Sequence, residues 1–329
     1  MLNTAAEERD SFTPPQLRHK IKSLSRVSLL VSLYHLLEVW LIVGLAVYCS
    51  VVVLPPTSSV GGGALYLLVV AIIASRQHAL MVLTHEAIHK RLARPFWLND
   101  WIARFVAAFP IFISLSKWRF IHLYHHQYTH TAADPDRAIY GRYPLTRTKF
   151  FRVLVRDTCG LNVIATLKYF IDIPFLGKGF NRRFLGKERE SQYQRTADMR
   201  AFALFWITVV GIGVAVGGTR SVGLFVCYWL VPYCTITQIL FRIRGAIEHG
   251  SVPNPGDSYR QTRTYLINPV CSFFFSPKKV NYHLEHHLYP SVPFYNLPRL
   301  HKLLQREIYP STGGYCETFL VGMAKLITK

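Results

Sequence analysis

The sequence predicts an all-α integral membrane protein, with four transmembrane helices arranged as two hairpins and a large cytosolic helical cap that holds a metal site. Half of the 329 residues are hydrophobic and only 17% are charged, against about 25% in average globular chains. The apolar residues gather in four long runs, and histidines gather in three short clusters. The formal net charge of +20 is typical of proteins that meet nucleic acid or an anionic membrane surface. The apolar runs decide for the membrane, so we expect no nucleic-acid partner.

Each apolar run is compatible with a bilayer span, which takes about 20 residues. A short Pro/Ser/Gly connection separates the first two runs, and five residues that begin with two glycines separate the last two. Such short connections predict one hairpin from each pair. The expected spans are approximately residues 27–54, 60–83, 201–216 and 222–240.

The distribution of Lys and Arg predicts the orientation of these spans. Twenty lie in 84–200, eleven in 241–329 and five in 1–26, whereas the two hairpin connections hold none and one. Cytoplasmic loops carry the excess of basic residues, so both termini and the long middle segment are expected in the cytoplasm. The resulting organisation is an N-terminal cytosolic segment, a first hairpin, a cap segment, a second hairpin and a second cap segment, at 1–26, 27–83, 84–200, 201–240 and 241–329.

Two further stretches contain many apolar residues but do not have the length or composition of a clear transmembrane span. Trp101–Leu115 is short and contains Arg104, which favours an interfacial or re-entrant helix. Phe151–Leu176 mixes apolar and charged residues and is expected to lie on a surface as an amphipathic segment. The six cysteines form no C-x-x-C pair and are expected as free thiols. The polar first 20 residues predict no cleavable signal peptide.

Eight of the fourteen histidines form three clusters with helical spacing. The first is H-x-x-x-H, which places two imidazoles on one helix face. The second and third are both H-x-x-H-H, 161 residues apart, and all three clusters fall on the predicted cytoplasmic side. Their members are His85 and His89, then His122, His125 and His126, and finally His283, His286 and His287. Lone histidines such as His19, His35 and His301 are interpreted as ordinary packed or surface residues.

This concentration of imidazoles predicts a metal site, and the number of ligands indicates two ions. One ion cannot use eight imidazoles, whereas two adjacent ions with four or five nitrogens each can share the clusters. Imidazole suits Zn, Cu, Fe and Ni. Zinc has no redox chemistry, and copper more often recruits Cys or Met, neither of which lies in the clusters. Two irons therefore fit best.

Two other classes of protein share part of this pattern. His85-Glu86-Ala87-Ile88-His89 also matches H-E-x-x-H, in which the glutamate is the general base of a zinc metalloprotease. That mechanism needs two histidines and one further ligand, and it leaves both H-x-x-H-H clusters without a role. A metal transporter would place its histidines along the spans rather than mainly in the cap.

The clusters resemble the three histidine boxes of the membrane fatty acid desaturase superfamily. The resemblance runs roughly from the second span to Leu303, and it includes Asp134-Pro135-Asp136 after the second box and Pro290 after the third. It implies the two-hairpin topology and a di-iron centre that activates O2. Members of this superfamily either remove two hydrogens from adjacent carbons or insert an oxygen. The resemblance also implies a ninth ligand, His249, about ten residues past the fourth expected span.

Several neighbouring residues are candidates for roles around the ligands. Metal-bound histidines usually donate their other N–H to a carboxylate, carbonyl or water, and Asp134 and Asp136 are the best placed carboxylates, followed by Glu86. An intramembrane polar residue usually faces a cavity or the protein interior. The remaining candidates are His78 on the substrate path, His130 beside the second box, and Asn281 as a partner for a water at the metal.

The function that follows is an O2-dependent desaturase acting on a lipid or other acyl substrate, with a hydroxylase of the same superfamily as the alternative. Aromatic residues such as Trp118, Phe120 and Phe273–Phe275 are candidates to line its tunnel. An external electron donor of the ferredoxin, cytochrome b5 or rubredoxin type is implied. A bacterial inner membrane is favoured over the endoplasmic reticulum.

Overall fold

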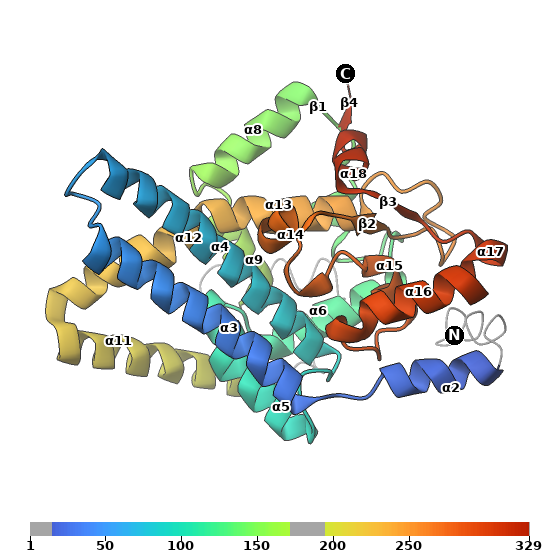
Figure 1. Cartoon of the computed structure of the whole chain (residues 1–329), viewed down its shortest axis with the longest axis horizontal. Coiled ribbons are helices and arrows are strands. Elements are labelled where there is room, and N and C mark those ends of the chain that lie inside the picture. The colour runs from blue at the N-terminus through green and yellow to red at the C-terminus, as the bar shows by residue number, and fades with distance from the viewer. Residues whose placement is uncertain (1–14, 172–194, 329) are drawn as a thin grey trace.

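The computed structural model describes residues 15–171 and 195–328, which are mostly helical (Figure 1). The longer helices form the elongated left part of the view, and shorter helices and small strands gather on the right. The α-helices are α2 (Pro15–Leu24), α3 (Leu29–Tyr48), α4 (Val60–Ile88), α5 (Phe96–Ile102), α6 (Leu115–Tyr128), α7 (Arg137–Tyr140), α8 (Arg147–Thr158), α9 (Val163–Phe170), α11 (Arg195–Phe225), α12 (Val231–Cys234), α13 (Ile236–His249), α14 (Pro269–Phe275), α15 (His283–Leu288), α16 (Leu297–Glu307), α17 (Tyr309–Thr312) and α18 (Phe319–Lys325).

Three helical segments are long and apolar enough to cross a membrane. Leu29–Val53 combines α3 with a terminal π-helical turn, and Val60–Ile88 is α4. Figure 1 shows these two helices side by side and running in opposite directions. Ser59 caps α4 by accepting a hydrogen bond from the Gly62 backbone N–H at 3.1 Å. Helix α4 continues past the expected end at residue 83, and its last turns are buried within the protein.

The third segment, Asp198–His249, contains both of the remaining expected spans. Gly218 interrupts its helical geometry with φ of 55° and ψ of −144°. Glycine adopts positive φ without the steric penalty that other residues incur. Figure 1 shows the chain turning back between α11 and α12. Helix α13 then continues in the return direction and ends at His249.

The stretch expected to be interfacial or re-entrant forms a bent pair of helices. Phe96–Ile111 meets α6 at 93°, a geometry of either a broken span or a re-entrant loop, with Phe112 in the left-handed conformation at the bend. Non-helical backbone at membrane depth is tolerated only where protein satisfies its polar groups. Indole N–H groups from other helices do so here, donating to the carbonyls of residues 106, 109 and 110: Trp40 at 3.1 Å, Trp206 at 3.2 Å and Trp229 at 2.7 Å. This bend directs α6 towards the interior.

The second ambiguous stretch forms two short helices as far as the structure describes it. Helix α8 buries Phe150 and Asp157 and exposes Phe151 and Val155 beside several basic side chains. Helix α9 follows, and the expected amphipathic segment beyond residue 171 lies outside the described residues. The six cysteines all lie in the described ranges, and all are free.

Two small parallel sheets attach the C-terminal segment to the rest of the molecule. Strand β1 (Leu145–Thr146) pairs with β4 (Ile327–Thr328), and β2 (Thr264–Leu266) pairs with β3 (Cys316–Thr318). Next to β2, the buried guanidinium of Arg263 lies 3.0 Å from a carboxylate oxygen of Glu317. Its Nη2 also donates to the carbonyl of Gly250 at 2.8 Å. The end of α13 is thereby tied to the C-terminal strands.

Candidate metal centre

The structure brings all nine histidines that the sequence analysis named as ligands into one buried region. Four helices supply them: α4 and its C-cap, α6, the last residue of α13, and α15. Seven of the nine residues are buried, and His89 and His126 are partly buried. Their ring nitrogens form two adjacent groups.

The first histidine group consists of five imidazoles from α4, α6 and α15. One ring nitrogen from each lies within 4.8 Å of those of all the others. Three Nε2 pairs are closer: His122 to His89 at 3.1 Å, His126 to His122 at 3.0 Å, and His126 to His286 at 3.1 Å. The members of this group are His85, His89, His122, His126 and His286.

The second histidine group consists of four imidazoles from α6, α13 and α15. His249 is common to two clusters of potential ligands, one with His125 and His287, the other with His283 and Glu248. The Nε2 atoms of His249 and His283 are 2.9 Å apart. The two groups touch, because the ring of His287 stacks on that of His126 with centroids 4.1 Å apart.

These spacings fit the ligand shell of metal ions. Two nitrogens at about 2.1 Å from one ion and at a right angle to each other are about 3 Å apart. Buried nitrogens also lack hydrogen-bond partners among the described residues, including Nε2 of His85 and Nε2 of His287. A buried polar atom without a partner is costly, and coordination would remove that cost. Five imidazoles in the first group exceed the four ligands of a tetrahedral zinc site.

Asp134 supports His125 from outside the two groups. Its Oδ1 lies 2.8 Å from His125 Nδ1, so an N–H on Nδ1 leaves Nε2 free to bind a metal. The carboxylate also accepts from the backbone N–H of Asp136 at 2.9 Å, from that of His130 at 3.0 Å, and from the Tyr140 hydroxyl. Although burial raises the pKa of Asp134, these donors, with His125 foremost, hold it below its ordinary value. The residue therefore stays an ionised acceptor.

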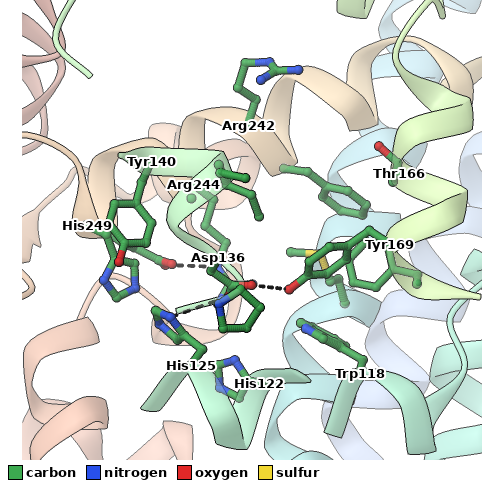
Figure 2. A pocket seen from close by; sticks show the side chains of 18 of the residues that line it. Trp118, His122, His125, Asp136, Tyr140, Thr166, Tyr169, Arg242, Arg244 and His249 are labelled. Carbon is green, nitrogen blue, oxygen red and sulfur yellow. Dashed lines mark hydrogen bonds and ion pairs between the residues drawn. The ribbon is translucent and has the colours of Figure 1, made fainter. Parts of the chain in front are cut away.

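Asp136 and His130 complete this side of the centre. Asp136 accepts from the hydroxyl of Tyr169 and lies 3.8 Å from His125 Nδ1, and Figure 2 shows it between the two side chains. His130 binds the carbonyl of Gln261 through Nε2 at 2.6 Å. Its side chain is therefore attached to the loop before β2 rather than directed at a neighbouring ligand's nitrogen.

Two glutamates fix the third box relative to the rest of the chain. Glu86 accepts from the backbone N–H of Phe294 at 2.9 Å, which joins α4 to the segment after α15. Glu285, within the third box, lies 2.7 Å from His301 Nδ1 and accepts from Tyr309 at 2.5 Å. The hydroxyl of Thr264 is its third donor. Sequence analysis placed His301 among the ordinary packed histidines, and a lone histidine carries no local signal of this contact.

Two of the named neighbours point elsewhere. His78 is buried in α4 with Nδ1 3.4 Å from the carbonyl of Phe274, and it is not among the residues that line the cavity described next. The side-chain amide of Asn281 donates to the carbonyl of Tyr265 at 3.0 Å. This hydrogen bond holds the Asn281 side chain against β2.

A cavity of about 400 Å³, the reaction cavity, opens directly onto the histidines. Figure 2 shows His122, His125 and Trp118 at the bottom of the view, His249 on the left and Tyr169 on the right. The ligands in its lining come from both groups, and its apolar wall is formed by Met81, Trp118, Ile139, Phe170 and Phe241. Of the aromatic residues that the sequence suggested for a tunnel, Trp118 lies in this lining, whereas Phe120 and Phe273–Phe275 do not.

Polar residues of α13 in the same lining were missed by sequence analysis. The buried Arg244 donates through Nε to Glu248 at 2.9 Å, one helical turn away, and Glu248 Oε2 lies 3.6 Å from His283 Nε2. Both residues fall at the end of a long apolar segment. Their i, i+4 spacing gave no signal of a buried site, because acid–base pairs with this spacing are common on helix surfaces. At Gly245, an added Cβ would lie 2.8 Å from Ile139, so glycine allows α7 to approach α13 closely.

Comparison with known proteins identifies the family. Residues 62–319 match the model of the family described as fatty acid desaturase. The dihydrorhizobitoxine desaturase of Bradyrhizobium elkanii is 29% identical over 275 residues, which cover 79% of this chain and 75% of that protein. An sn-1 oleoyl-lipid 12-desaturase of Picosynechococcus sp. is 26% identical over 69% of this chain and 65% of its own length. An sn-1 acyl-lipid omega-3 desaturase (ferredoxin) of Nostoc sp. is 23% identical over 72% of this chain and 65% of its own length. With its histidine clusters gathered in one buried centre, this chain belongs to the fatty acid desaturase family.

Proposed function

We propose that this protein is an O2-dependent membrane di-iron desaturase that introduces a C=C bond into the apolar acyl chain of a lipid. The observation that carries the proposal is the convergence of nine imidazoles into two touching groups. An all-imidazole first group and a second group with Glu248 at its edge fit two ions better than one. The H-E-x-x-H hydrolase does not account for this arrangement, because His85 and His89 share their group with three further imidazoles.

In this proposal the nine histidines hold two irons, His85, His89, His122, His126 and His286 around one and His125, His249, His283 and His287 around the other. When bound, the irons would supply the O2 activation and the electron transfer that removal of two hydrogens requires. Asp134 holds the tautomer of His125, as its hydrogen bond at 2.8 Å indicates. Glu86 binds the backbone N–H of Phe294, and Glu285 binds the side chain of His301. These contacts fix the positions of α4 and α15.

The reaction cavity supports an apolar substrate segment. Its apolar wall adjoins the histidines, because the ring of Trp118 lies 6.1 Å from that of His122, so a hydrocarbon chain can lie against Trp118 and Phe170 and present a C–H bond to the centre. The same centre could catalyse hydroxylation or desaturation. The placement of the substrate decides between the two reactions, and the ligand set does not. The Bradyrhizobium relative is named for dihydrorhizobitoxine, so that compound belongs in any panel of substrates tested.

We further propose a multi-pass membrane protein with both termini and the histidine centre in the cytoplasm. The three long apolar segments correspond to the four expected spans, because Asp198–His249 covers two of them, and the basic residues outside them favour this orientation. A bacterial inner membrane is favoured because the relatives named above are bacterial. The electrons would come from an external donor of the ferredoxin, cytochrome b5 or rubredoxin class, with ferredoxin first because one relative's name includes it.

The test combines metal content with product mass. Detergent-purified protein is expected to contain about two irons per chain, and cells that produce it should accumulate a lipid lighter by two hydrogens. His125→Ala and His286→Ala should remove this product and lower bound iron, whereas His19→Ala, at an exposed position on α2, should do neither. A product heavier by one oxygen would establish the hydroxylase instead. Zinc that persists after anaerobic purification and iron reconstitution would overturn the redox function.

A further inference from the structure

A second cavity of about 440 Å³ adjoins the reaction cavity and has a different lining. Five of its eight lining residues are cationic, and the lining contains no carboxylate. We call it the basic cavity; its residues are Arg142, Leu145, Lys149, Arg152, Val153, Arg156, Asn162 and Arg242. Three of them, Arg142, Asn162 and Arg242, also line the reaction cavity. The two cavities therefore adjoin each other at these three residues.

The inner end of the basic cavity is a constructed site rather than a chance gathering of surface charges. Asp157 is fully buried in α8 and lies beneath this end. Its Oδ1 accepts from Arg242 Nη2 at 2.9 Å and from Asn162 Nδ2 at 2.6 Å, and its Oδ2 accepts from Arg242 Nε. The guanidinium of Arg242 is thus fixed where the two cavities meet, and Figure 2 shows this side chain at the edge of the reaction cavity.

The outer end carries more positive charge than the described residues neutralise. Arg142, Lys149, Arg152 and Arg156 are exposed, and none of them makes an ion pair with another residue that the structure describes. Like charges held around one cavity repel each other, and a multiply charged oxyanion relieves that repulsion. Arginine matches phosphate in shape because its planar fork donates two parallel hydrogen bonds. The lining therefore fits a phosphate ester.

The position of α8 indicates where the phosphate comes from. Phe151 is 69% exposed and Val155 is 42% exposed, and they alternate along the helix with Lys149, Arg152 and Arg156. A helix that exposes apolar and basic side chains together is typical of a membrane surface with anionic lipids. A phospholipid at that surface would present its headgroup phosphate to the basic cavity and its acyl chain to the reaction cavity.

We propose that the basic cavity binds the phosphate of the substrate's headgroup and so fixes how deep the acyl chain enters the reaction cavity. This inference rests on the proposed desaturase function and names its substrate as a phosphorylated lipid. The apolar wall of the reaction cavity holds the chain, and Arg142 and Arg242 mark the point where the headgroup ends and the chain begins. The basic cavity selects the lipid headgroup by its charge, and the reaction cavity selects the acyl chain by its shape.

The test measures binding without turnover, in the full-length, metal-loaded protein in detergent. The probe is dihexanoyl phosphatidate, a water-soluble lipid with one phosphate, and dihexanoylglycerol is its neutral counterpart. The variant is Arg152→Ala with Arg156→Ala, which removes two cations one turn apart on α8. The matched control is Lys302→Ala with Arg306→Ala, which removes two exposed cations one turn apart on α16.

We expect the α8 variant to weaken phosphatidate binding at least about tenfold, as loss of charged hydrogen bonds predicts. The α16 control should match the parent protein, and added salt should weaken only phosphatidate. Arg152→Lys with Arg156→Lys should retain most of the affinity. Dihexanoylglycerol should bind all four proteins equally, which also shows that the variants are folded.

Two further probes decide the source of the phosphate and test the alternatives. If inorganic phosphate binds as tightly as phosphatidate, the phosphate site stands but its ligand is a soluble phosphate. If the α8 variant binds phosphatidate like the parent, the proposal is wrong. It is also wrong if that variant only slows reduction by ferredoxin, because the basic surface would then dock an acidic protein. Failure of the desaturase function would show separately, as missing iron or missing product in the parent protein.

Discussion

The two histidine groups are built from the same boxes but differ in their surroundings. Among the described residues, the first group is formed by imidazoles alone, and its closest carboxylate oxygen is that of Glu86, 3.8 Å from His85 Nδ1. The second has three carboxylates at 3.8 Å or less, Glu248 beside His283, and Asp134 and Asp136 beside His125. The first group is therefore held by the helices that carry it, whereas the second depends on a loop and on the end of α13.

The boxes divide between the groups in a complementary way. His122 and His126 join the first group and His125 the second, whereas His283 and His287 join the second and His286 the first. In a helix, residues i and i+4 lie about 40° apart around the axis, and residue i+3 lies about 100° from i+4. Each H-x-x-H-H box thus sends its i, i+4 pair to one group and its middle histidine to the other. Neither box alone can build either group.

The largest loss of activity should come from removing the ligands that α15 supplies to the two groups. His286→Ala removes one ligand from the first group, and His287→Ala, at the next residue, removes one from the second. Because each variant leaves a ligand shell incomplete, we expect desaturation to fall by more than about a hundredfold and bound iron to fall in both. Iron per chain and lipid products are the measurements, with His19→Ala as the control. Full activity in either variant would remove that residue from the centre.

A smaller effect should separate the groups through Asp134. Asp134→Asn keeps the size of the side chain but removes the charge that orients His125, so metal affinity or activity should fall by about 10- to 100-fold. The expected defect is confined to the second group, and iron titration should therefore show one site weakened. Asp257→Asn, which changes a partly exposed aspartate in a turn, should be silent. Equal weakening of both sites would mean that the groups do not bind independently.

The comparable support on α15 is Glu285 with His301. His301→Ala removes one of the three donors to the buried carboxylate, and we expect about 1–3 kcal/mol lower stability with activity reduced severalfold. Glu285→Gln should act in the same direction. Thermal unfolding and iron content are the measurements, and His19→Ala again serves as the control because it is an exposed histidine. No change in either measurement would show that α15 is held by its apolar contacts alone.

Sequence analysis found the eight box histidines because their spacing is local and helical periodicity preserves it. It could not assign them to groups, since His125 and His126 are neighbours in sequence yet belong to different groups. That division depends on the angle at which α6 meets α4 and α15, and the 93° bend before α6 is set by distant tryptophans. His249 came from family resemblance, and Glu248 was missed.

The cavities were beyond sequence analysis for a similar reason. Lys149 and Arg152 carry no local sequence signal of a cavity, and only the packing of α8 against α13 brings them together with Arg242. The apolar wall has the same origin, because Phe170 from α9 and Phe241 from α13 are 71 positions apart. Local patterns predict ligands well when one helix carries them, and poorly when several elements form one surface.

The smallest expected effect is at Glu86, and it sharpens the contrast between an oxidoreductase and a hydrolase. Glu86→Gln retains an oxygen that can accept from the Phe294 N–H, and the 3.8 Å between the carboxylate and His85 lies outside hydrogen-bond range. Desaturation should therefore stay within about threefold of the parent. If Glu86 were the general base of an H-E-x-x-H site, the same change would remove the activity. A product assay on Glu86→Gln beside His89→Ala decides this, because a hydrolase loses function in both variants and a di-iron desaturase only in the second.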